Sequence, residues 1–228
     1  GDNTVSYDAT APTVTVEQAA GQADPSGSTP IEFTVGFSEP VSGFATGDVT
    51  LGGTAGATTG TVSEIAPNDG TTYTVAVSGM TGDGTVLASI GSSKAQDTAG
   101  NGNTASTSGD NRVLYDTVAP SVTIEQAAGQ ADPINVGPID FTVKFSEPVS
   151  GFATGDVTMS GAFGSLAGTV SEIAPNDGTT YKVAVSGMTG TGELVATIDA
   201  GVAEDLAGQP NSASTSADNT VTYDDVPP

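Results

Sequence analysis

IEFTVGFSEPVSGF, residues 31–44, contains the two patterns from which the fold and the function of this chain are predicted. Every second residue from Ile31 to Phe37 is apolar, and this period is typical of a β-strand with one buried face. Glu39 follows that strand closely, and its carboxylate has the same inward parity as the apolar residues. The first pattern predicts a β-sheet protein, and the second raises the question of what this carboxylate binds.

Seven segments of the first half of the chain have strand character, and clusters of Gly, Pro, Asn and Asp separate them. The expected strands are 13–17, 31–37, 48–51, 57–65, 71–77, 85–90 and 111–115. Seven short strands in about 100 residues are typical of an immunoglobulin-like sandwich. Because the second half repeats the first, we predict an all-β fold of two tandem immunoglobulin-like β-sandwich domains, with about seven strands each.

The repeat is visible without gaps along nearly the whole chain. APTVTVEQAAGQADP at 11–25 returns as APSVTIEQAAGQADP at 119–133, and about two thirds of the aligned residues of the two halves are identical. The segment that joins the halves, YDTVAP at 115–120, is short and contains a proline. This composition predicts a stiff connection between neighbouring repeats.

The ends of the chain resemble the ends of the repeats. GDNTVSYD at 1–8 is similar to GDNRVLYD at 109–116, so 1–8 is predicted to be the last strand of a preceding repeat with its linker. The expected organisation is therefore a first repeat at 9–116, a second repeat at 117–224, and the start of a further linker at 225–228.

The charge of the chain restricts its partners. Twenty-seven Asp and Glu against four Lys and Arg give a formal net charge of -23, which disfavours nucleic acid and anionic membrane surfaces. No apolar run reaches about 18 residues, so no membrane insertion is predicted. With so few basic side chains, most carboxylates must face water, cations or each other.

The chain has no Cys and no His, which excludes disulfides, thiolate ligands and the usual proton shuttles. Only Lys94, Lys144 and Lys182 could activate its many hydroxyl groups, and Lys144 aligns with Gly36 of the other repeat. The chain is therefore predicted not to be an enzyme.

Six acidic residues are predicted to gather at the pole where the chain enters each sandwich. In immunoglobulin strand order, the loops after the second and sixth strands meet the incoming segment at that pole. The candidates are Asp8, Glu39 and Asp97 in the first repeat, and Asp116, Glu147 and Asp205 in the second. Like charges this close repel unless a cation joins them, and an oxygen-only set fits Ca²⁺. Asp24 or Asp132, in the loop at the far pole, is a further candidate ligand from a neighbouring repeat.

Three motifs together resemble the bacterial immunoglobulin-like repeats of large surface and calcium-dependent adhesins. They are the Asp-x-x-Ala-Pro start, SEPVSGF after the second strand, and the DTAGN loop at 97–101. The resemblance covers 9–224 and implies spacer repeats with calcium at the joints, on the bacterial cell surface or outside the cell. It implies neighbouring repeats as partners, with any surface ligand bound by other domains. The second repeat departs from the pattern, because Gln209 stands where the first has Asn101.

Other interpretations remain open on the sequence. The acids could be solvated loop residues, strand ends or turn formers, and the overall acidity could be an adaptation to high salt. Asp48 and Asp69, with their equivalents, are predicted to be turn residues. A carbohydrate-binding module, or an accessory domain of a secreted enzyme, is the alternative function. Phe44, Phe152 and Phe163 are the aromatic residues that could stack on a sugar.

Overall fold

The computed structural model describes residues 3–226, and the chain divides into two compact units after Thr117. They are called the first and the second repeat below. This division lies one residue beyond the boundary expected at 116/117. Residues 1 and 2 of the segment 1–8, and residues 227 and 228 of the segment 225–228, lie outside the described residues.

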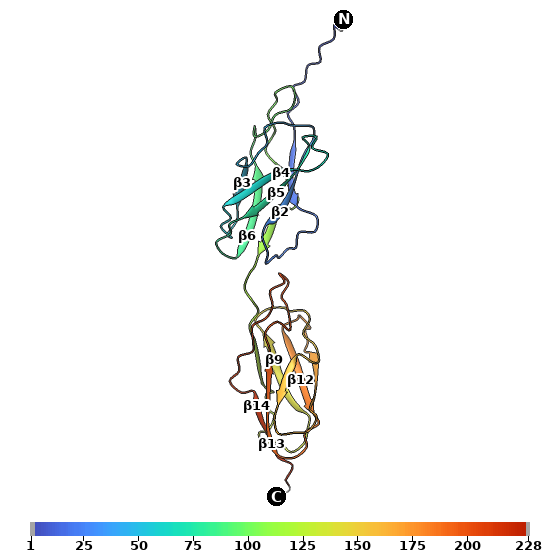
Figure 1. The fold of residues 1–228 in the computed structure, drawn as a ribbon, viewed down its shortest axis with the longest axis vertical. Coiled ribbons are helices and arrows are strands. Elements are labelled where there is room, and N and C mark those ends of the chain that lie inside the picture. Colours follow the sequence, from blue (N-terminus) through green and yellow to red (C-terminus); the bar gives the residue numbers. More distant parts are fainter. Residues whose placement is uncertain (1–2, 227–228) are drawn as a thin grey trace. The chain divides into compact units, whose positions relative to one another are not determined.

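The first repeat is a sandwich of seven strands, as predicted. They are β1 (Val14–Gln18), β2 (Ile31–Phe37), β3 (Val49–Gly52), β4 (Thr59–Glu64), β5 (Thr72–Ser78), β6 (Gly84–Ile90) and β7 (Arg112–Tyr115). One sheet has the order β1-β2-β5-β4 and the other β3-β6-β7, with antiparallel neighbours throughout. Figure 1 shows β2, β5 and β4 side by side. This is the strand order of a constant-type immunoglobulin domain.

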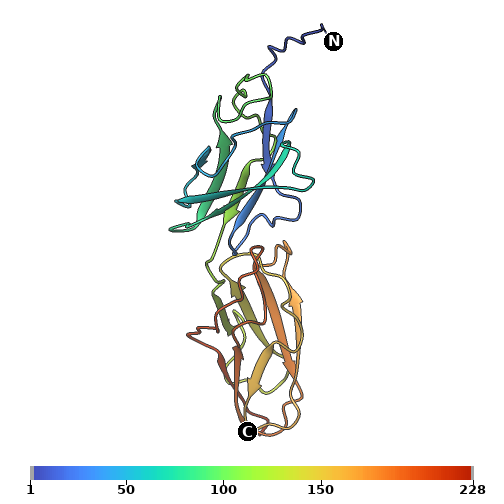
Figure 2. The same cartoon turned by 45° about the horizontal axis from the view of Figure 1, so that its top comes forward.

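The second repeat has the same seven strands and the same order. They are β8 (Val122–Gln126), β9 (Ile139–Phe145), β10 (Val157–Ser160), β11 (Ala167–Glu172), β12 (Thr180–Ser186), β13 (Gly192–Ile198) and β14 (Thr220–Tyr223). Its sheets are β8-β9-β12-β11 and β10-β13-β14. In each repeat, taken by itself, the strands run between two poles at which the loops gather (Figure 2). None of the described residues forms a helix that could cross a bilayer.

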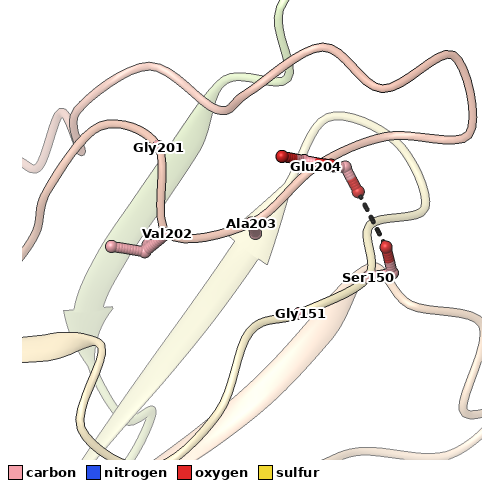
Figure 3. A pocket seen from close by; sticks show the side chains of 6 residues that line it. All are labelled: Ser150, Gly151, Gly201, Val202, Ala203 and Glu204. Atoms are coloured by element: carbon pink, nitrogen blue, oxygen red, sulfur yellow. Dashed lines mark hydrogen bonds between the residues drawn. The ribbon is translucent and has the colours of Figure 1, made fainter.

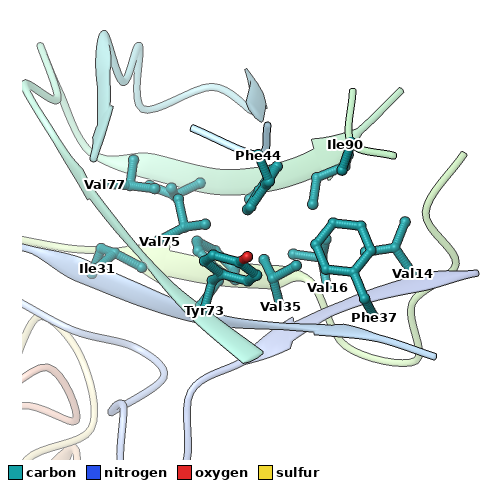
Figure 4. Packing of buried hydrophobic residues seen from close by; sticks show 14 of the residues in the cluster. Val14, Val16, Ile31, Val35, Phe37, Phe44, Tyr73, Val75, Val77 and Ile90 are labelled. Atoms are coloured by element: carbon teal, nitrogen blue, oxygen red, sulfur yellow. The ribbon is translucent and has the colours of Figure 1, made fainter. Parts of the chain in front are cut away.

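The core of each repeat lies between its two sheets. The β2–β5 register pairs Phe33 with Val75 and Ile31 with Val77, so the apolar face of one strand lies beside that of the next. Figure 4 shows side chains from both sheets of the first repeat pointing toward one another. Phe44, from the loop after β2, completes this core. Its ring packs edge-on against those of Tyr73 and Phe37, with ring centroids 5.1 and 5.3 Å apart.

The direction of the strands defines the two poles. β1 begins where β2 ends, since Val14 pairs with Phe37. β6 ends on the same side, because an isolated bridge between Ser42 and Gln96 joins the loop after β2 to the loop after β6. The N-terminal pole therefore carries the incoming segment and the loops after β2 and β6. The C-terminal pole carries the β1–β2 loop, the β5–β6 loop and the end of β7.

Residues 3–8 form no strand in this chain, and the prediction that 1–8 ends a preceding repeat stays a prediction. Val5 and Tyr7 are 94% and 91% exposed. The similar sequence of β7 becomes a strand because β6 pairs with it, whereas no strand of the described residues lies along 3–8. The same sequence thus adopts a strand only where a neighbour satisfies its backbone.

Candidate metal centre

The N-terminal pole of the first repeat brings three predicted carboxylates together. Asp8 lies on the incoming segment, Glu39 follows β2, and Asp97 lies in the loop after β6. One carboxylate oxygen from each lies within 4.8 Å of the others. Asp8 is exposed, Glu39 is half-buried and Asp97 is buried, so the group extends from solvent to the mouth of the sandwich. The positions agree with the sequence prediction, while metal binding itself stays a prediction.

The second group of acids, Asp116, Glu147 and Asp205, recurs 108 residues later in the sequence. Asp116 lies on the segment that joins the two repeats, and Glu147 and Asp205 lie on the loops after β9 and β13 of the second repeat. Asp205 is buried like Asp97, and the other two are half-buried. The same residue types at the same places of both repeats therefore give two groups of three carboxylates.

The loop after β6 is built around Asp97. The Asp97 Oδ1 accepts hydrogen bonds from the backbone N–H groups of Ala99 and Asn101, both at 2.8 Å. Gly100 closes the loop at φ +90°, in the left-handed region that favours glycine. The turn-forming alternative for Asp97 is thus confirmed, and it is compatible with a second role because each carboxylate oxygen accepts more than one contact.

The Asn101 side chain connects the incoming segment to this loop. Its Nδ2 donates to the Asp97 Oδ2 at 2.8 Å and to the Asp8 carbonyl oxygen at 3.2 Å. The Asn101 side chain is the main cause that holds the pKa of Asp97 below its ordinary value; backbone N–H donors also lower it, and burial opposes them. Asp97 is therefore a carboxylate at neutral pH. Asn101 turns its amide nitrogen, rather than its oxygen, toward the Asp97 carboxylate.

Sequence reasoning missed the residue that holds the loop in place. Asn103 is only 1% exposed, and its Oδ1 accepts from the N–H groups of Lys94 and Ala95 at 2.7 and 2.8 Å. Its Nδ2 donates to the carbonyl oxygens of Gly91 and Thr104 at 3.0 and 2.6 Å. Asn211 makes the equivalent bonds in the second repeat. The only sequence signal was an Asn that recurs at the same place of both loops.

Backbone hydrogen bonds join the two loops that carry the acids. In the second repeat, Ser150 and Glu204 exchange N–H···O bonds of 2.8 and 3.0 Å, and the Ser150 Oγ donates to the Glu204 carbonyl oxygen at 3.4 Å (Figure 3). A pocket of about 160 Å³ lies beside this contact. Ser42 and Gln96 make the same exchange in the first repeat. The acids are therefore held on connected backbone rather than on independent loops.

Asp205 differs from Asp97 in its hydrogen bonds. Its Oδ1 accepts from the Gln209 N–H at 2.8 Å, but its buried Oδ2 has no hydrogen-bond partner in the part of the chain that the structure describes. The residue is 6% exposed. A buried carboxylate oxygen without a partner is costly, and a cation supplies the missing partner.

The donor set fits calcium. It consists of oxygen atoms only, and the chain contains neither His nor Cys. Two ligands on opposite sides of a Ca²⁺ ion lie about 4.6–5.2 Å apart, because each bond is about 2.3–2.6 Å long. Separations within 4.8 Å agree with this limit. Among the described residues, the ion pairs Lys94–Asp48 and Lys182–Asp140 do not involve Asp8, Glu39 or Asp97.

Asp24 and Asp132 have another role at the C-terminal pole. The Asp24 Oδ1 accepts from the Leu114 N–H at 2.8 Å, and the Asp132 Oδ1 accepts from the Thr222 N–H at 2.9 Å. These bonds hold the last strand of each repeat to its β1–β2 or β8–β9 loop. Neither acid belongs to the two groups, so their proposed role as metal ligands gains no support and stays a prediction.

The remaining candidates behave as turn or core residues. Asp48 accepts from the Ala45 N–H at 2.9 Å and Asp69 from the Thr71 N–H at 3.1 Å, which confirms both as turn formers. Phe44 and Phe152 are 8% exposed and belong to the cores. Phe163 is half-buried against Tyr223, with ring centroids 6.1 Å apart. These three rings are packed rather than displayed for stacking.

The strand order of each sandwich defines an immunoglobulin-like domain. The comparison with protein families gives the same class. The family described as "Bacterial Ig-like domain" matches residues 8–113 and 116–223. The chain therefore belongs to the bacterial Ig-like domain family. The two matches begin at Asp8 and Asp116, the first acid of each group. No curated protein matches the chain.

Several solved structures are similar in fold. FdeC, an Escherichia coli adhesin, is 16% identical, and the match covers 90% of this chain and 64% of that chain, with a TM-score of 0.44. The N-terminal part of the bacterial S-layer protein SbsC is 18% identical over 95% of this chain and 45% of its own (TM-score 0.31). The Yersinia pseudotuberculosis adhesin InvE is 14% identical over 93% and 58% (TM-score 0.30). This chain thus spans 45% to 64% of the length of these structures.

Proposed function

We propose that this chain provides spacer repeats of a secreted bacterial surface adhesin, and that Ca²⁺ bound at the N-terminal pole of each repeat stiffens the array. The observation that carries the proposal is the convergence of Asp8, Glu39 and Asp97 within 4.8 Å, in a chain with a net charge of -23. Three ionised groups at this distance repel one another, and a divalent cation turns the repulsion into attraction.

The residues of this chain would act as a clamp. Asp8 belongs to the segment that enters the sandwich, whereas Glu39 and Asp97 belong to loops anchored in the core. A bound Ca²⁺ supplies a positive charge shared by all three acids. The incoming segment is thereby fixed to the sandwich, and it loses the freedom that a short chain segment otherwise has. A repeat array stiffened in this way would hold a distant adhesive domain away from the cell.

The family and the burial of three aromatic rings also support the spacer interpretation. The chain belongs to the bacterial Ig-like domain family, and two copies stand in tandem. The carbohydrate-binding alternative depended on Phe44, Phe152 and Phe163, and these rings are buried or half-buried. Secretion, a place on the cell surface and the absence of catalysis are parts of the proposal.

Calorimetric titration with Ca²⁺ tests the metal site. We expect dissociation constants of roughly 10⁻⁴ to 10⁻³ M, the range of extracellular calcium modules. Glu39→Gln and Glu147→Gln should each abolish one site, because each removes one carboxylate and keeps the side-chain length. Glu32→Gln is the matched control, since Glu32 lies on the exposed face of β2. Equal responses to Na⁺ and Ca²⁺ would instead support the salt-adaptation interpretation.

X-ray scattering tests the spacer role. Chelation of Ca²⁺ should broaden the distribution of particle dimensions of the two-repeat chain, and added Ca²⁺ should restore it. The double variant Glu39→Gln/Glu147→Gln should resemble the chelated protein under all conditions. Identical scattering with and without Ca²⁺, in a protein that binds the ion, would rule out stiffening and leave a binding site without a mechanical role.

A further inference from the structure

We infer that position 101, and its equivalent 209, sets how strongly each repeat depends on the cation. Asn101 donates hydrogen bonds that partly stabilise the first site without an ion. Gln209 donates no such side-chain bond to Asp205, so the second site depends more on the ion for its stability. This inference rests on the proposed calcium site and adds a graded response to it.

The backbone of the two loops is similar, and three side chains differ, because Thr98, Asn101 and Gly102 are replaced by Leu206, Gln209 and Pro210. Of these positions, 101 and 209 carry the amide groups beside the buried Asp. Asp97 and Asn101 are joined by an N–H···O bond of 3.1 Å, and Asp205 and Gln209 by one of 3.1 Å. Gly100 and Gly208 have φ values of +90° and +80°. The acids of both loops therefore begin from the same scaffold.

In the first repeat, the Asn101 amide makes contacts that a bound cation would otherwise make. Its Nδ2 donates to the Asp97 Oδ2 and to the Asp8 carbonyl oxygen, so it joins the loop to the incoming segment without any ion. A hydrogen bond from an amide to a carboxylate is stronger than one between neutral groups. A cation that used the same oxygen would have to compete with this donor.

In the second repeat, the Asp205 Oδ2 receives no such donor. It is buried without a hydrogen-bond partner among residues 3–226, and Asp205 as a whole is 6% exposed. Half-buried Gln209 gives Asp205 only its backbone N–H. The ion-free second site therefore carries an unsatisfied charged oxygen, and cation binding removes that penalty.

The two sites should consequently differ in affinity. One hydrogen bond to a charged group corresponds to about a tenfold change in a binding constant. We expect the second site to bind Ca²⁺ about tenfold more tightly than the first. When a chelator removes Ca²⁺, the 205–209 loop should exchange its amide hydrogens faster than the 97–101 loop, because fewer hydrogen bonds hold it.

The test is a Ca²⁺ titration of the whole chain, followed by NMR at the amides of residues 97–101 and 205–209. The protein is compared with Asn101→Gln, with Gln209→Asn, and with the control Glu32→Gln. Asn101→Gln should raise the Ca²⁺ affinity of the first site about tenfold, to the level of the second site. Gln209→Asn should weaken the second site by a similar factor and slow the exchange of its loop in chelator.

The outcomes separate the two levels of the argument. The role of position 101/209 is refuted if both loops titrate at the same Ca²⁺ concentration. It is also refuted if the two substitutions leave the first site weaker than the second. In either case the calcium proposal stands. If neither loop responds to Ca²⁺ in the unmodified chain, the calcium proposal fails, and the graded response fails with it.

Discussion

The C-terminal poles of the two repeats make the same connection with donor and acceptor exchanged. In the first repeat, the Asp83 Oδ1 accepts from the Thr117 N–H at 2.8 Å and from its Oγ1 at 2.7 Å. In the second repeat, the Thr191 Oγ1 is the donor, and it lies 3.2 Å from the Asp225 Oδ1 and 3.1 Å from the Asp224 Oδ1. The Gly190 N–H also donates to the Asp225 Oδ2 at 3.1 Å. Thr191 is the equivalent of Asp83, and Asp225 is the equivalent of Thr117.

This exchange shows that a difference between copies need not mean a lost interaction. Asp83 and Thr191 differ in charge and size, so the sequence alone gives no sign that they make an equivalent contact. The structure shows a pair that changed together and kept the hydrogen bond between the β5–β6 loop, or its equivalent, and the departing chain. At the N-terminal pole the opposite occurs, because Gln209 stands in place of Asn101 and the Asp205 Oδ2 has no partner among the described residues.

The largest change in the free energy of unfolding is expected from substitutions in the cores. These substitutions also test whether the two repeats fold independently. Phe33 and Phe141 are both 0% exposed, and each belongs to a cluster made only of residues from its own repeat. Phe33→Ala and Phe141→Ala should each lower the free energy of unfolding of one repeat by about 3–5 kcal/mol. Urea unfolding followed by NMR signals of each repeat measures this. Loss of both repeats from one substitution would show that they do not fold independently.

The next effect concerns the amide anchors of the acid-bearing loops. Asn103→Ala and Asn211→Ala each remove a side chain with four hydrogen bonds, so we expect a loss of about 2–4 kcal/mol in either repeat. Asn219→Ala is the graded control, because its side chain donates one bond, to the Ala196 carbonyl oxygen at 2.8 Å, and should cost about 1 kcal/mol. Equal losses for Asn211→Ala and Asn219→Ala would contradict this ranking.

A smaller effect is expected from the exchanged pair. Asp83→Thr should lower the stability of the first repeat by about 1 kcal/mol, because the Thr117 donors lose their carboxylate. Adding Thr117→Asp should recover most of that loss, since it recreates the arrangement of the second repeat. A double-mutant cycle in urea measures the coupling. Simple additivity of the two substitutions would mean that the exchange is accidental.

The smallest effect is a dependence on pH. The N–H groups of Gly109 and Asp110 donate to Glu17 and hold its pKa below the ordinary value of 4.5. A lowered folded-state pKa stabilises the first repeat above the unfolded-state pKa, and this contribution is lost as the pH falls through the folded-state pKa. Glu17→Gln should therefore flatten the acid side of the stability profile of the first repeat below about pH 4.5. Melting temperatures between pH 3 and pH 7, compared with those of the second repeat, would show it.

The sequence was sufficient for the strands, because the period of two in segments such as 31–37 directly reflects a buried face. It was also sufficient to bring Asp8, Glu39 and Asp97 together, since strand order fixes which loops share a pole. Residues 3–8 have strand character in the sequence but form no strand here, because pairing depends on a neighbour that a local pattern does not contain.

Hydrogen-bond partners in the loops could not be predicted. The direction in which Asn101 turns its amide depends on the backbone path through Gly100, and the four partners of Asn103 depend on the fold of the whole loop. The pairing of Asp83 with Thr117 joins positions far apart in the sequence, and it becomes visible only when the end of β7 is placed beside the β5–β6 loop.

The position of Asp8 has a practical consequence for work with isolated domains. All seven strands of the first repeat lie between Val14 and Tyr115, so a fragment that starts at Ala9 keeps the complete sandwich. Such a fragment nevertheless lacks one of the three grouped carboxylates. The segment sufficient for folding is shorter than the segment that holds the whole acid group, and a fragment trimmed to the sandwich would test a damaged version of the pole.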